Sequence, residues 1–460
     1  MKSVKIIHTN DIHSKYEEFL RMAYVIEKNK DENSLLLDAG DFNDFSSFIT
    51  FGTKGYAGLK MLNMLGYSAL TIGNNEGFQD IDIIESSCNY NLVNILSCNL
   101  YTIDDKEISG LKKSIIKTIN GIRFLIIGVS PYHFSYNVFY NLHNLKAVEP
   151  FEIIRNEIKT HKDQYDLVIL LSHLGLKADI MMAQSIENID LIISGHSHHV
   201  FDCVKVNNTY IHQSGVRGSH IGVLNLKIKD NKIIEIIDEN ILIDDKTPIN
   251  NKIKQEYLKQ QEIASKNLSE PLFKINQDLT YSIDKECNLT NLVADYLYNS
   301  YSCDLSLVNS GLTASNLKKG NISYKDILDV CNSPLEITTM DVKGKYILEA
   351  IKESMKKEKC YDSYRRAGFR GEFLGKLHVP YNCKIIENGT KLNVYINNKL
   401  INQEEYYKVV TTDYFYRGMG YECLKNNING KIHKETIEEA IINALKTIDN
   451  YKFINNFRYK

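Results

Sequence analysis

The stretch LIISGHSHH at residues 191–199 is the most informative part of this sequence, because a short apolar run ends there in a group of histidines. Residues 191–193 suit a buried β-strand by their length and their β-branched side chains. His196 and His198 stand two positions apart, so in an extended segment they point to the same side. The stretch therefore predicts a strand whose end presents imidazole groups to a shared site.

Four other apolar runs between residues 1 and 235 end in polar residues in the same way. The runs at 4–7, 35–37, 69–72 and 167–171 lead to Asp11-Ile12-His13, Gly40-Asp41, Gly73-Asn74-Asn75-Glu76 and Ser172-His173. Helical patterns separate the runs, and strands that alternate with helices indicate a layered α/β domain. In such a sheet, ligands bind beyond the carboxyl ends of the strands, so we expect all five loops to converge.

The residue types in these loops fit a pair of divalent ions. Imidazole suits Mn, Zn, Co or Fe, and carboxylate and amide oxygens add harder ligands. One carboxylate, such as that of Asp41, can bridge two ions about 3.5–4 Å apart. A lone histidine in a strand-end loop is usually structural, but five strand ends that all carry ligand-type residues indicate a metal site.

Composition excludes several other functions. The 460 residues include 55 Lys plus Arg and 57 Asp plus Glu, so no basic surplus exists to bind a nucleic-acid polymer. No apolar run approaches the roughly 18 residues of a membrane span, so we expect no membrane association. The N-terminal apolar stretch is too short for a signal peptide, and nine singly spaced cysteines suggest reduced thiols. We therefore expect a cytoplasmic protein.

The second half of the chain predicts a separate α+β domain. Residues 241–270 become polar and rich in Lys, Gln and Glu, which is typical of a linker. An amphipathic helix follows, with its apolar stripe at Leu289, Leu292, Val293, Tyr296 and Leu297. Strand patterns lie at 391–396 and 407–412. We expect an α/β domain that carries the metal site at 1–240, a linker helix region at 241–270 and an α+β domain at 271–460.

Taken together, these motifs resemble a known family. HTNDIHS, DAGDF, TIGNNE, LLSHLG and SGHSHH occur in this order over about residues 5–200, and ECNLTNLVADYLYN, LVNSGLTAS and ISYKDILDV follow in the second half. The sequence resembles the calcineurin-like metallophosphoesterases, and specifically the two-domain bacterial 5'-nucleotidase family. The resemblance implies an N-terminal four-layer β-sandwich flanked by helices and a C-terminal α+β substrate-binding domain.

The resemblance also assigns metal ligands and a reaction. The first of two ions would be held by Asp11, His13, Asp41 and His198, and the second by Asp41, Asn74, His173 and His196. The implied reaction is in-line attack on phosphorus by a metal-activated hydroxide, which cleaves phosphate from a nucleotide or a related phosphorylated metabolite. Alternatives are a metal-bound sensor or binding protein with little turnover, and a cyclic-nucleotide or dinucleotide phosphodiesterase. The sequence does not choose between a monomer and a dimer.

The catalytic motif departs from the family pattern at one position. The usual Gly-Asn-His-Glu reads Gly-Asn-Asn-Glu, so Asn75 replaces the catalytic His, and Phe78 stands where its Asp partner is expected. Asn75 can donate a hydrogen bond to a phosphate oxygen but cannot give a proton to the leaving group. Losing a general acid costs typically 10²–10⁴-fold in rate. We expect Asn75 and Asp41 to act in a slower enzyme that favours good leaving groups.

The substrate-binding motifs have also changed. Asn-x-Gly-Gly-Ile-Arg reads NSGLTA at 309–314 without its Arg, and the aromatic motif reads DYFYRGMGY at 413–421 without its usual Asp. A basic-aromatic cluster, RRAGFRG at 365–371, could bind phosphate through Arg, with Phe369 and Tyr414 or Phe415 around a planar base. The alternative is a solvated turn with one core Phe. The expected substrate contacts are Asn309, Arg365, Arg366, Phe369, Arg370, Tyr414 and Phe415.

Overall fold

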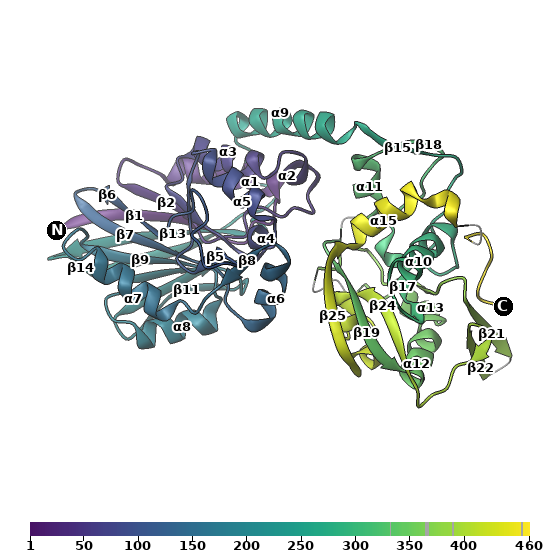
Figure 1. The fold of residues 1–460 in the computed structure, drawn as a ribbon. Coiled ribbons are helices and arrows are strands. Elements are labelled where there is room, and N and C mark those ends of the chain that lie inside the picture. Colours follow the sequence, from purple (N-terminus) through teal and green to yellow (C-terminus); the bar gives the residue numbers. More distant parts are fainter. Residues whose placement is uncertain (332, 364–367, 389–390, 452–453) are drawn as a thin grey trace. The chain divides into compact units, whose positions relative to one another are not determined.

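The structure is a computed structural model that describes residues 1–460 except 332, 364–367, 389–390 and 452–453. The chain divides into two compact units, Met1–Asn267 and Leu268–Lys460, and each has its own hydrophobic core (Figure 1). Helix α9 (Asn251–Leu268) lies in the stretch predicted as a linker and groups with the first unit up to Asn267. Within the part of the chain that the structure describes, no helix combines the length and apolar character needed to cross a bilayer.

The first unit contains two six-stranded sheets, which we call sheet A and sheet C. Sheet A has the order β14-β13-β1-β2-β3-β4 and sheet C the order β11-β12-β10-β9-β7-β6. The strands of sheet A are β1 (Lys2–Thr9), β2 (Ser34–Asp38), β3 (Ala69–Thr71), β4 (Asn94–Leu96), β13 (His220–Lys229) and β14 (Lys232–Leu242). Those of sheet C are β6 (Ser114–Ile119), β7 (Ile122–Val129), β9 (Leu167–Ser172), β10 (Leu191–Ser194), β11 (Val200–Val206) and β12 (Thr209–Ser214).

The predicted strands are confirmed, and their pairing explains why their ends meet. β1, β2, β3 and β4 run parallel in sheet A, and β7, β9, β10 and β12 run parallel in sheet C. Parallel strands deliver their carboxyl ends to one edge of the sheet. The loops that leave β1, β2 and β3 therefore lie at one edge of sheet A, and those that leave β9 and β10 lie at one edge of sheet C. The five runs thus belong to two sheets, whose edges meet where Asp11 of the first faces His173 of the second.

Alternation of side chains along each strand builds the four layers. Ile6 and Leu35 of sheet A join a core with Ile169 and Ile193 of sheet C, whereas Ile7 faces the helices that cover sheet A. These helices are α1 (Tyr16–Asn29), α3 (Tyr56–Leu65) and α5 (Ile81–Asn89), and α7 (Phe151–Thr160) and α8 (Leu176–Ser185) cover sheet C. The predicted sandwich flanked by helices is confirmed. The remaining elements of this unit are α2 (Phe48–Gly52), α4 (Asn74–Gly77), α6 (Phe134–Leu142), β5 (Leu100–Thr102) and β8 (Leu145–Ala147).

The second unit is α+β, as predicted. Its largest described sheet has the order β16-β24-β19-β25, and the predicted amphipathic helix is α10 (Asn288–Ser300). Its other helices are α11 (Tyr324–Val330), α12 (Gly344–Ser354), α13 (Lys357–Cys360), α14 (Asp413–Tyr416) and α15 (Ile437–Lys446), with 3₁₀ turns at Ser310–Leu312, Glu422–Lys425 and Ile448–Asn450. Its strands are β15 (Pro271–Ile275), β16 (Leu305–Ser306), β17 (Val308–Asn309), β18 (Gly320–Ser323), β19 (Glu336–Lys343), β20 (Leu377–His378), β21 (Cys383–Asn388), β22 (Lys391–Ile396), β23 (Lys399–Leu400), β24 (Tyr406–Thr412) and β25 (Asn427–Thr436).

Candidate metal centre

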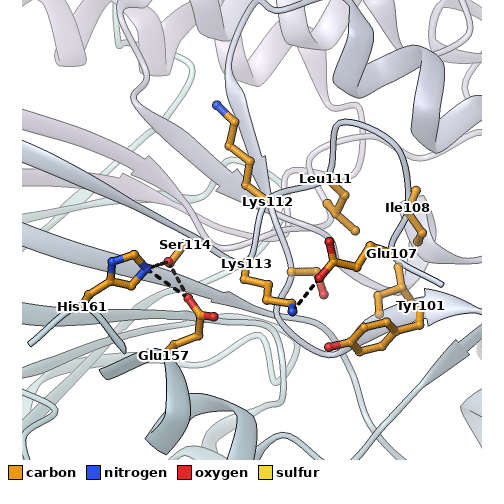
Figure 2. A pocket seen from close by; sticks show the side chains of 11 residues that line it. Tyr101, Glu107, Ile108, Leu111, Lys112, Lys113, Ser114, Glu157 and His161 are labelled. Carbon is orange, nitrogen blue, oxygen red and sulfur yellow. Dashed lines mark hydrogen bonds and ion pairs between the residues drawn. The ribbon is translucent and has the colours of Figure 1, made fainter. Parts of the chain in front are cut away.

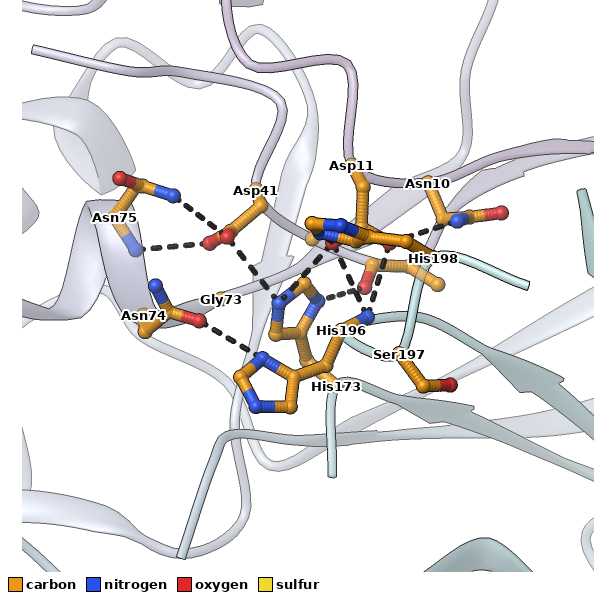
Figure 3. Close-up of polar contacts among 12 residues, drawn as sticks. Asn10, Asp11, Asp41, Gly73, Asn74, Asn75, His173, His196, Ser197 and His198 are labelled. Carbon is orange, nitrogen blue, oxygen red and sulfur yellow. Dashed lines mark hydrogen bonds and ion pairs between the residues drawn. The ribbon is translucent and has the colours of Figure 1, made fainter. Parts of the chain in front are cut away.

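The segments that follow the five strand ends bring the predicted ligand residues together, and Figure 3 labels all of them except His13. One group of donor atoms belongs to Asp11, His13 and His198, and all of them lie within 4.8 Å of one another. His198 Nε2 is 3.3 Å from Asp11 Oδ1, and His13 Nε2 is 3.4 Å from His198 Nε2. Two imidazoles and a buried carboxylate thus face a common point.

A second group of donor atoms comes from Asp11, Asp41 and His173, again within 4.8 Å of one another. His173 Nε2 lies 3.4 Å from Asp41 Oδ2 and 3.7 Å from Asp11 Oδ1. All three side chains are buried. Asp11 belongs to both groups, and Asp41 also faces the first, because its Oδ2 is 3.9 Å from His13 Nε2.

His173 shows most directly that a cation fits this cluster. Its Nδ1–H donates to the carbonyl oxygen of Ala39 at 2.6 Å, which leaves a lone pair on Nε2. Nε2 is buried and makes no hydrogen bond among the described residues, although two carboxylates lie close to it. Buried polar atoms are normally satisfied, so an imidazole nitrogen aimed at carboxylates fits a bound cation.

The remaining two predicted ligands contact each other at the edge of this cluster. Asn74 Oδ1 is 3.0 Å from His196 Nδ1, and the ring of His196 lies 5.2 Å from the ring of His173. The backbone N–H of His196 donates to the Asp11 carboxylate at 2.9 Å. All seven residues predicted as ligands are therefore brought to one neighbourhood, and their roles as ligands stay a prediction.

The backbone at the cluster adopts conformations that side chains other than glycine usually avoid. Left-handed φ angles occur at Asp11 (52°), His13 (50°), Asp41 (55°), His196 (70°) and His198 (59°). Among the described histidines, His13, His196 and His198 are the ones with a positive φ. Such strain costs of order 1–3 kcal/mol per residue and concentrates at functional sites. The loops are thus bent so that side chains from different strands face one another.

The charges of the cluster are strongly coupled. Burial lowers the pKa of His173, but the Asp41 and Asp11 carboxylates outweigh burial and raise that pKa to about 10. Burial raises the pKa of Asp41, but His173 and then His13 hold it well below its ordinary value. The buried carboxylates of Asp11 and Asp41 thus favour a positive charge next to them, and a cation bound at the neutral imidazole of His173 would supply that charge.

Three supporting carboxyl or amide groups were not assigned a role from the sequence. Glu76 accepts hydrogen bonds from the backbone N–H groups of Asp41, Asn43 and Gly73, and so ties two ligand loops together. The carboxylate of Asp179 accepts hydrogen bonds from the hydroxyls of Ser172 and Ser194, which are the last residues of β9 and β10. Asn10 donates to Asp11 Oδ2 at 2.7 Å. Glu76 and Asn10 stand inside the quoted motifs, whereas Asp179 carries no sequence signal.

Asn75 contacts two of the residues predicted as metal ligands, Asp41 and His13. Its backbone N–H donates to Asp41 Oδ1 at 2.8 Å, and its side-chain Nδ2 donates to Asp41 Oδ2 at 2.6 Å. The same Nδ2 lies 3.1 Å from His13 Nδ1. Gly73 must approach closely for this, because a Cβ added to it would lie 2.1 Å from Asp41 Oδ1. Asn75 therefore orients Asp41 and has its amide N–H groups already engaged.

The predicted substrate contacts of the second unit fall into three groups. Phe369 and Tyr414 are buried and stack on each other with centroids 5.1 Å apart and an interplanar angle of 27°, and Phe415 packs edge-on against Tyr421. A base could enter between Phe369 and Tyr414 only if these rings separated. Asn309 is buried and donates to Leu374 O, and the backbone N–H of Arg370 donates to Ser333 Oγ. Arg365 and Arg366 lie outside the described residues. The substrate-binding roles stay predictions.

A separate cavity of about 320 Å³ lies between β5, β6 and α7 (Figure 2). Ser114 Oγ donates to Glu157 Oε2 at 2.7 Å, and His161 Nε2 lies 3.4 Å from that hydroxyl. A nucleophilic triad needs the carboxylate at the other ring nitrogen. Here Glu157 lies 3.6 Å from the same Nε2 of His161, so the three side chains do not form a triad. None of the residues that line this cavity belongs to the metal cluster.

Comparisons with known proteins identify two domains in this chain. Residues 4–200 match the calcineurin-like phosphoesterases, and residues 266–426 match the C-terminal domain of 5'-nucleotidases. The uncharacterized metallophosphoesterase YunD of Bacillus subtilis is 26% identical over 446 residues, which cover 92% of this chain and 95% of YunD. A 5'-nucleotidase of Vibrio vulnificus is 23% identical and covers 98% of this chain and 92% of its own length.

A solved structure shares the fold at lower identity. The NAD nucleotidase of Haemophilus influenzae superposes with a TM-score of 0.67 at 17% identity, and the match covers 97% of this chain and 96% of that one. At that identity the likeness speaks for the fold alone. With both domains matched in order along the chain, this protein belongs to the two-domain 5'-nucleotidase family, in which a calcineurin-like metallophosphoesterase domain precedes a 5'-nucleotidase C-terminal domain.

Proposed function

We propose that this chain is a phosphohydrolase that uses two divalent metal ions to release phosphate from nucleotides or related phosphorylated metabolites. The observation that carries the proposal is the buried Nε2 of His173, which makes no hydrogen bond among the described residues yet faces the carboxylates of Asp11 and Asp41. A purely structural histidine would be expected to have both ring nitrogens satisfied. Membership of a phosphoesterase family supplies the class of reaction.

The side chains of the cluster would divide between two ions. Asp11, His13, Asp41 and His198 would hold one, and Asp41, Asn74, His173 and His196 the other. Two such ions, when bound, lower the pKa of water and neutralise charge on phosphoryl oxygens. The protein orients these ligands through Asn75 on Asp41 and through Ala39 O on His173.

The position of Asn75 limits which substrates react quickly. Its Nδ2 donates to Asp41 and contacts His13, and an amide has no acidic proton for a leaving group. A leaving group that departs as a stable anion needs no such proton. We therefore propose a preference for phosphoanhydrides and aryl phosphates over alkyl monoesters such as AMP.

The test is a phosphate-release assay over a panel of phosphorylated substrates, with Mn²⁺, Co²⁺ or Zn²⁺ added to the metal-depleted protein. The panel contains nucleoside mono-, di- and triphosphates, a cyclic nucleotide, a dinucleotide and p-nitrophenyl phosphate. Asp41→Ala should abolish turnover. Asp105→Ala is the matched control, because this carboxylate is largely exposed and pairs with Lys146 at the surface.

Each outcome separates the proposal from its alternatives. Metal-dependent phosphate release that is lost in Asp41→Ala supports a phosphohydrolase. Cleavage confined to the cyclic nucleotide or the dinucleotide would favour a phosphodiesterase instead. Uptake of two ions without turnover on any substrate would favour a metal-bound sensor or binding protein. The observation in favour of this alternative is that Asn75 cannot donate a proton. A folded chain that takes up no divalent ion would refute all three.

A further inference from the structure

Tyr136 contacts a proposed metal ligand from a helix that sequence analysis left without a role. It stands on α6, and its hydroxyl lies 2.9 Å from His196 Nε2. The two rings meet edge to face, with centroids 5.7 Å apart and an interplanar angle of 78°. The other ring nitrogen of His196, Nδ1, is 3.0 Å from Asn74 Oδ1. The imidazole is therefore held between a second proposed ligand and a phenol.

The chemistry of a neutral imidazole decides what this phenol can do. Only one of its two ring nitrogens carries a proton, and the other offers a lone pair. An ion bound beside Asn74 Oδ1 needs the lone pair on Nδ1 of His196, so the proton must be on Nε2. There it can donate to the hydroxyl oxygen of Tyr136. Metal-ligating histidines generally donate a hydrogen bond from their other ring N–H to an acceptor, and this bond fixes both the tautomer and the orientation of the ring.

We infer that Tyr136 is a positioning residue that holds His196 in the tautomer and orientation needed to bind the second ion. The inference rests on the proposed two-metal function and adds a residue outside the ligand set. His173 has the same kind of acceptor, because its Nδ1–H donates to the carbonyl of Ala39. The two histidines proposed to bind the second ion, His173 and His196, would thus be oriented by different partners, one a backbone carbonyl and the other a side chain.

Packing around Tyr136 keeps its hydroxyl in place. The ring of Phe78 lies 5.8 Å from that of Tyr136, and it also packs against Phe139 and Tyr140. The side chain of Asn137 bonds the backbone N–H and carbonyl of Ala147 and so fixes α6 against β8. Phe78 stands where the family's pattern leads one to expect an Asp. In this chain the same position supports an aromatic cluster that contains Tyr136.

The test measures metal binding by Tyr136→Phe, which removes one oxygen and keeps the ring. Co²⁺ is titrated into the metal-depleted protein, with the visible absorption of the bound ion and the heat of binding as readouts. The wild type should bind two ions. In Tyr136→Phe, one of the two should bind about 10–100-fold more weakly, with an altered absorption band, and the other should bind as before. Tyr132→Phe is the matched control, because Tyr132 is exposed in the same segment.

A double-variant comparison tests whether Tyr136 acts through His196. If it does, adding Tyr136→Phe to His196→Ala should not weaken Co²⁺ binding further, because the two effects share one path. A Tyr136→Phe protein that binds two ions as tightly as the wild type, or more tightly, would overturn the inference while the proposed function stands. Additive weakening in the double variant would also overturn it. A wild-type protein that binds no Co²⁺ would instead overturn the proposed function, and this inference with it.

Discussion

Replacing Asn75 by His tests how this chain differs from the family pattern. The imidazole would stand beside Asp41 and could supply the proton that Asn75 cannot give. A general acid is worth typically 10²–10⁴-fold. The lower end applies here because Phe78, packed among aromatic rings, leaves no carboxylate to orient the new imidazole. We therefore expect the kcat/KM for AMP, relative to that for p-nitrophenyl phosphate, to rise about 10²-fold, which corresponds to roughly 2.7 kcal/mol.

The same substitution should not help a substrate whose leaving group needs no proton. It also removes the bond from Asn75 Nδ2 to Asp41 Oδ2, and a hydrogen bond to a charged group contributes about 1.5–3 kcal/mol. Hydrolysis of p-nitrophenyl phosphate should therefore stay level or fall. The assay is kcat/KM for both substrates at saturating metal.

Asn75→Ala separates the two effects of the substitution. It loses the side-chain bond to Asp41 but keeps the backbone N–H bond of 2.8 Å to the same carboxylate. Both substrates should slow by a similar factor in this variant. An unchanged ratio of kcat/KM for AMP to kcat/KM for the aryl ester in Asn75→His would refute the reasoning about the missing proton donor.

Three further predictions concern stability. Chelation of the two bound ions should lower the Tm of the first unit by roughly 10–20 °C if they were present at about 100 times Kd, because such binding contributes about 2.7 kcal/mol per ion; an unchanged scanning-calorimetry trace would contradict it. Burial raises the pKa of Asp179 from 3.8 to about 7, so the folded state holds an extra proton between these values and loses stability as pH rises through them. Asp179→Asn has no ionisable group at this position, so its free energy of unfolding relative to that of the wild type should increase by on the order of 2–4 kcal/mol between pH 4 and pH 8. Urea unfolding measures this difference, and a difference that does not depend on pH would disprove the burial argument. Arg458→Met leaves the buried carboxylates of Asp295 and Glu286 without their cation and should cost about 3–5 kcal/mol in the same assay; a loss below about 1 kcal/mol would show that the ion pair contributes little.

The ligand residues could be predicted because their signals are local. Each follows a short apolar run, as His173 follows 167–171 and His196 follows 191–193, and a buried strand and its end can be recognised within a few residues. Parallel pairing then brings these ends to one edge of each sheet, which is a general property of such sheets, and the packing of sheet A on sheet C joins the two edges. The Asn at position 75 was equally visible, because it stands inside a contiguous motif.

Other features of the site depend on contacts that leave no local pattern. The bond between Tyr136 and His196 joins residues 60 positions apart, and Tyr136 on α6 packs against Phe78 at the end of α4, the helix that carries Asn74. Asp179 bonds the hydroxyls of Ser172 and Ser194 from a helix whose sequence gives no sign of it. The direct stacking of Phe369 on Tyr414 likewise appears only in the folded unit. Hydrophobic periodicity determines which segments become strands and where they end, whereas side-chain contacts between distant elements are set by how those elements pack, and packing is a property of the whole unit.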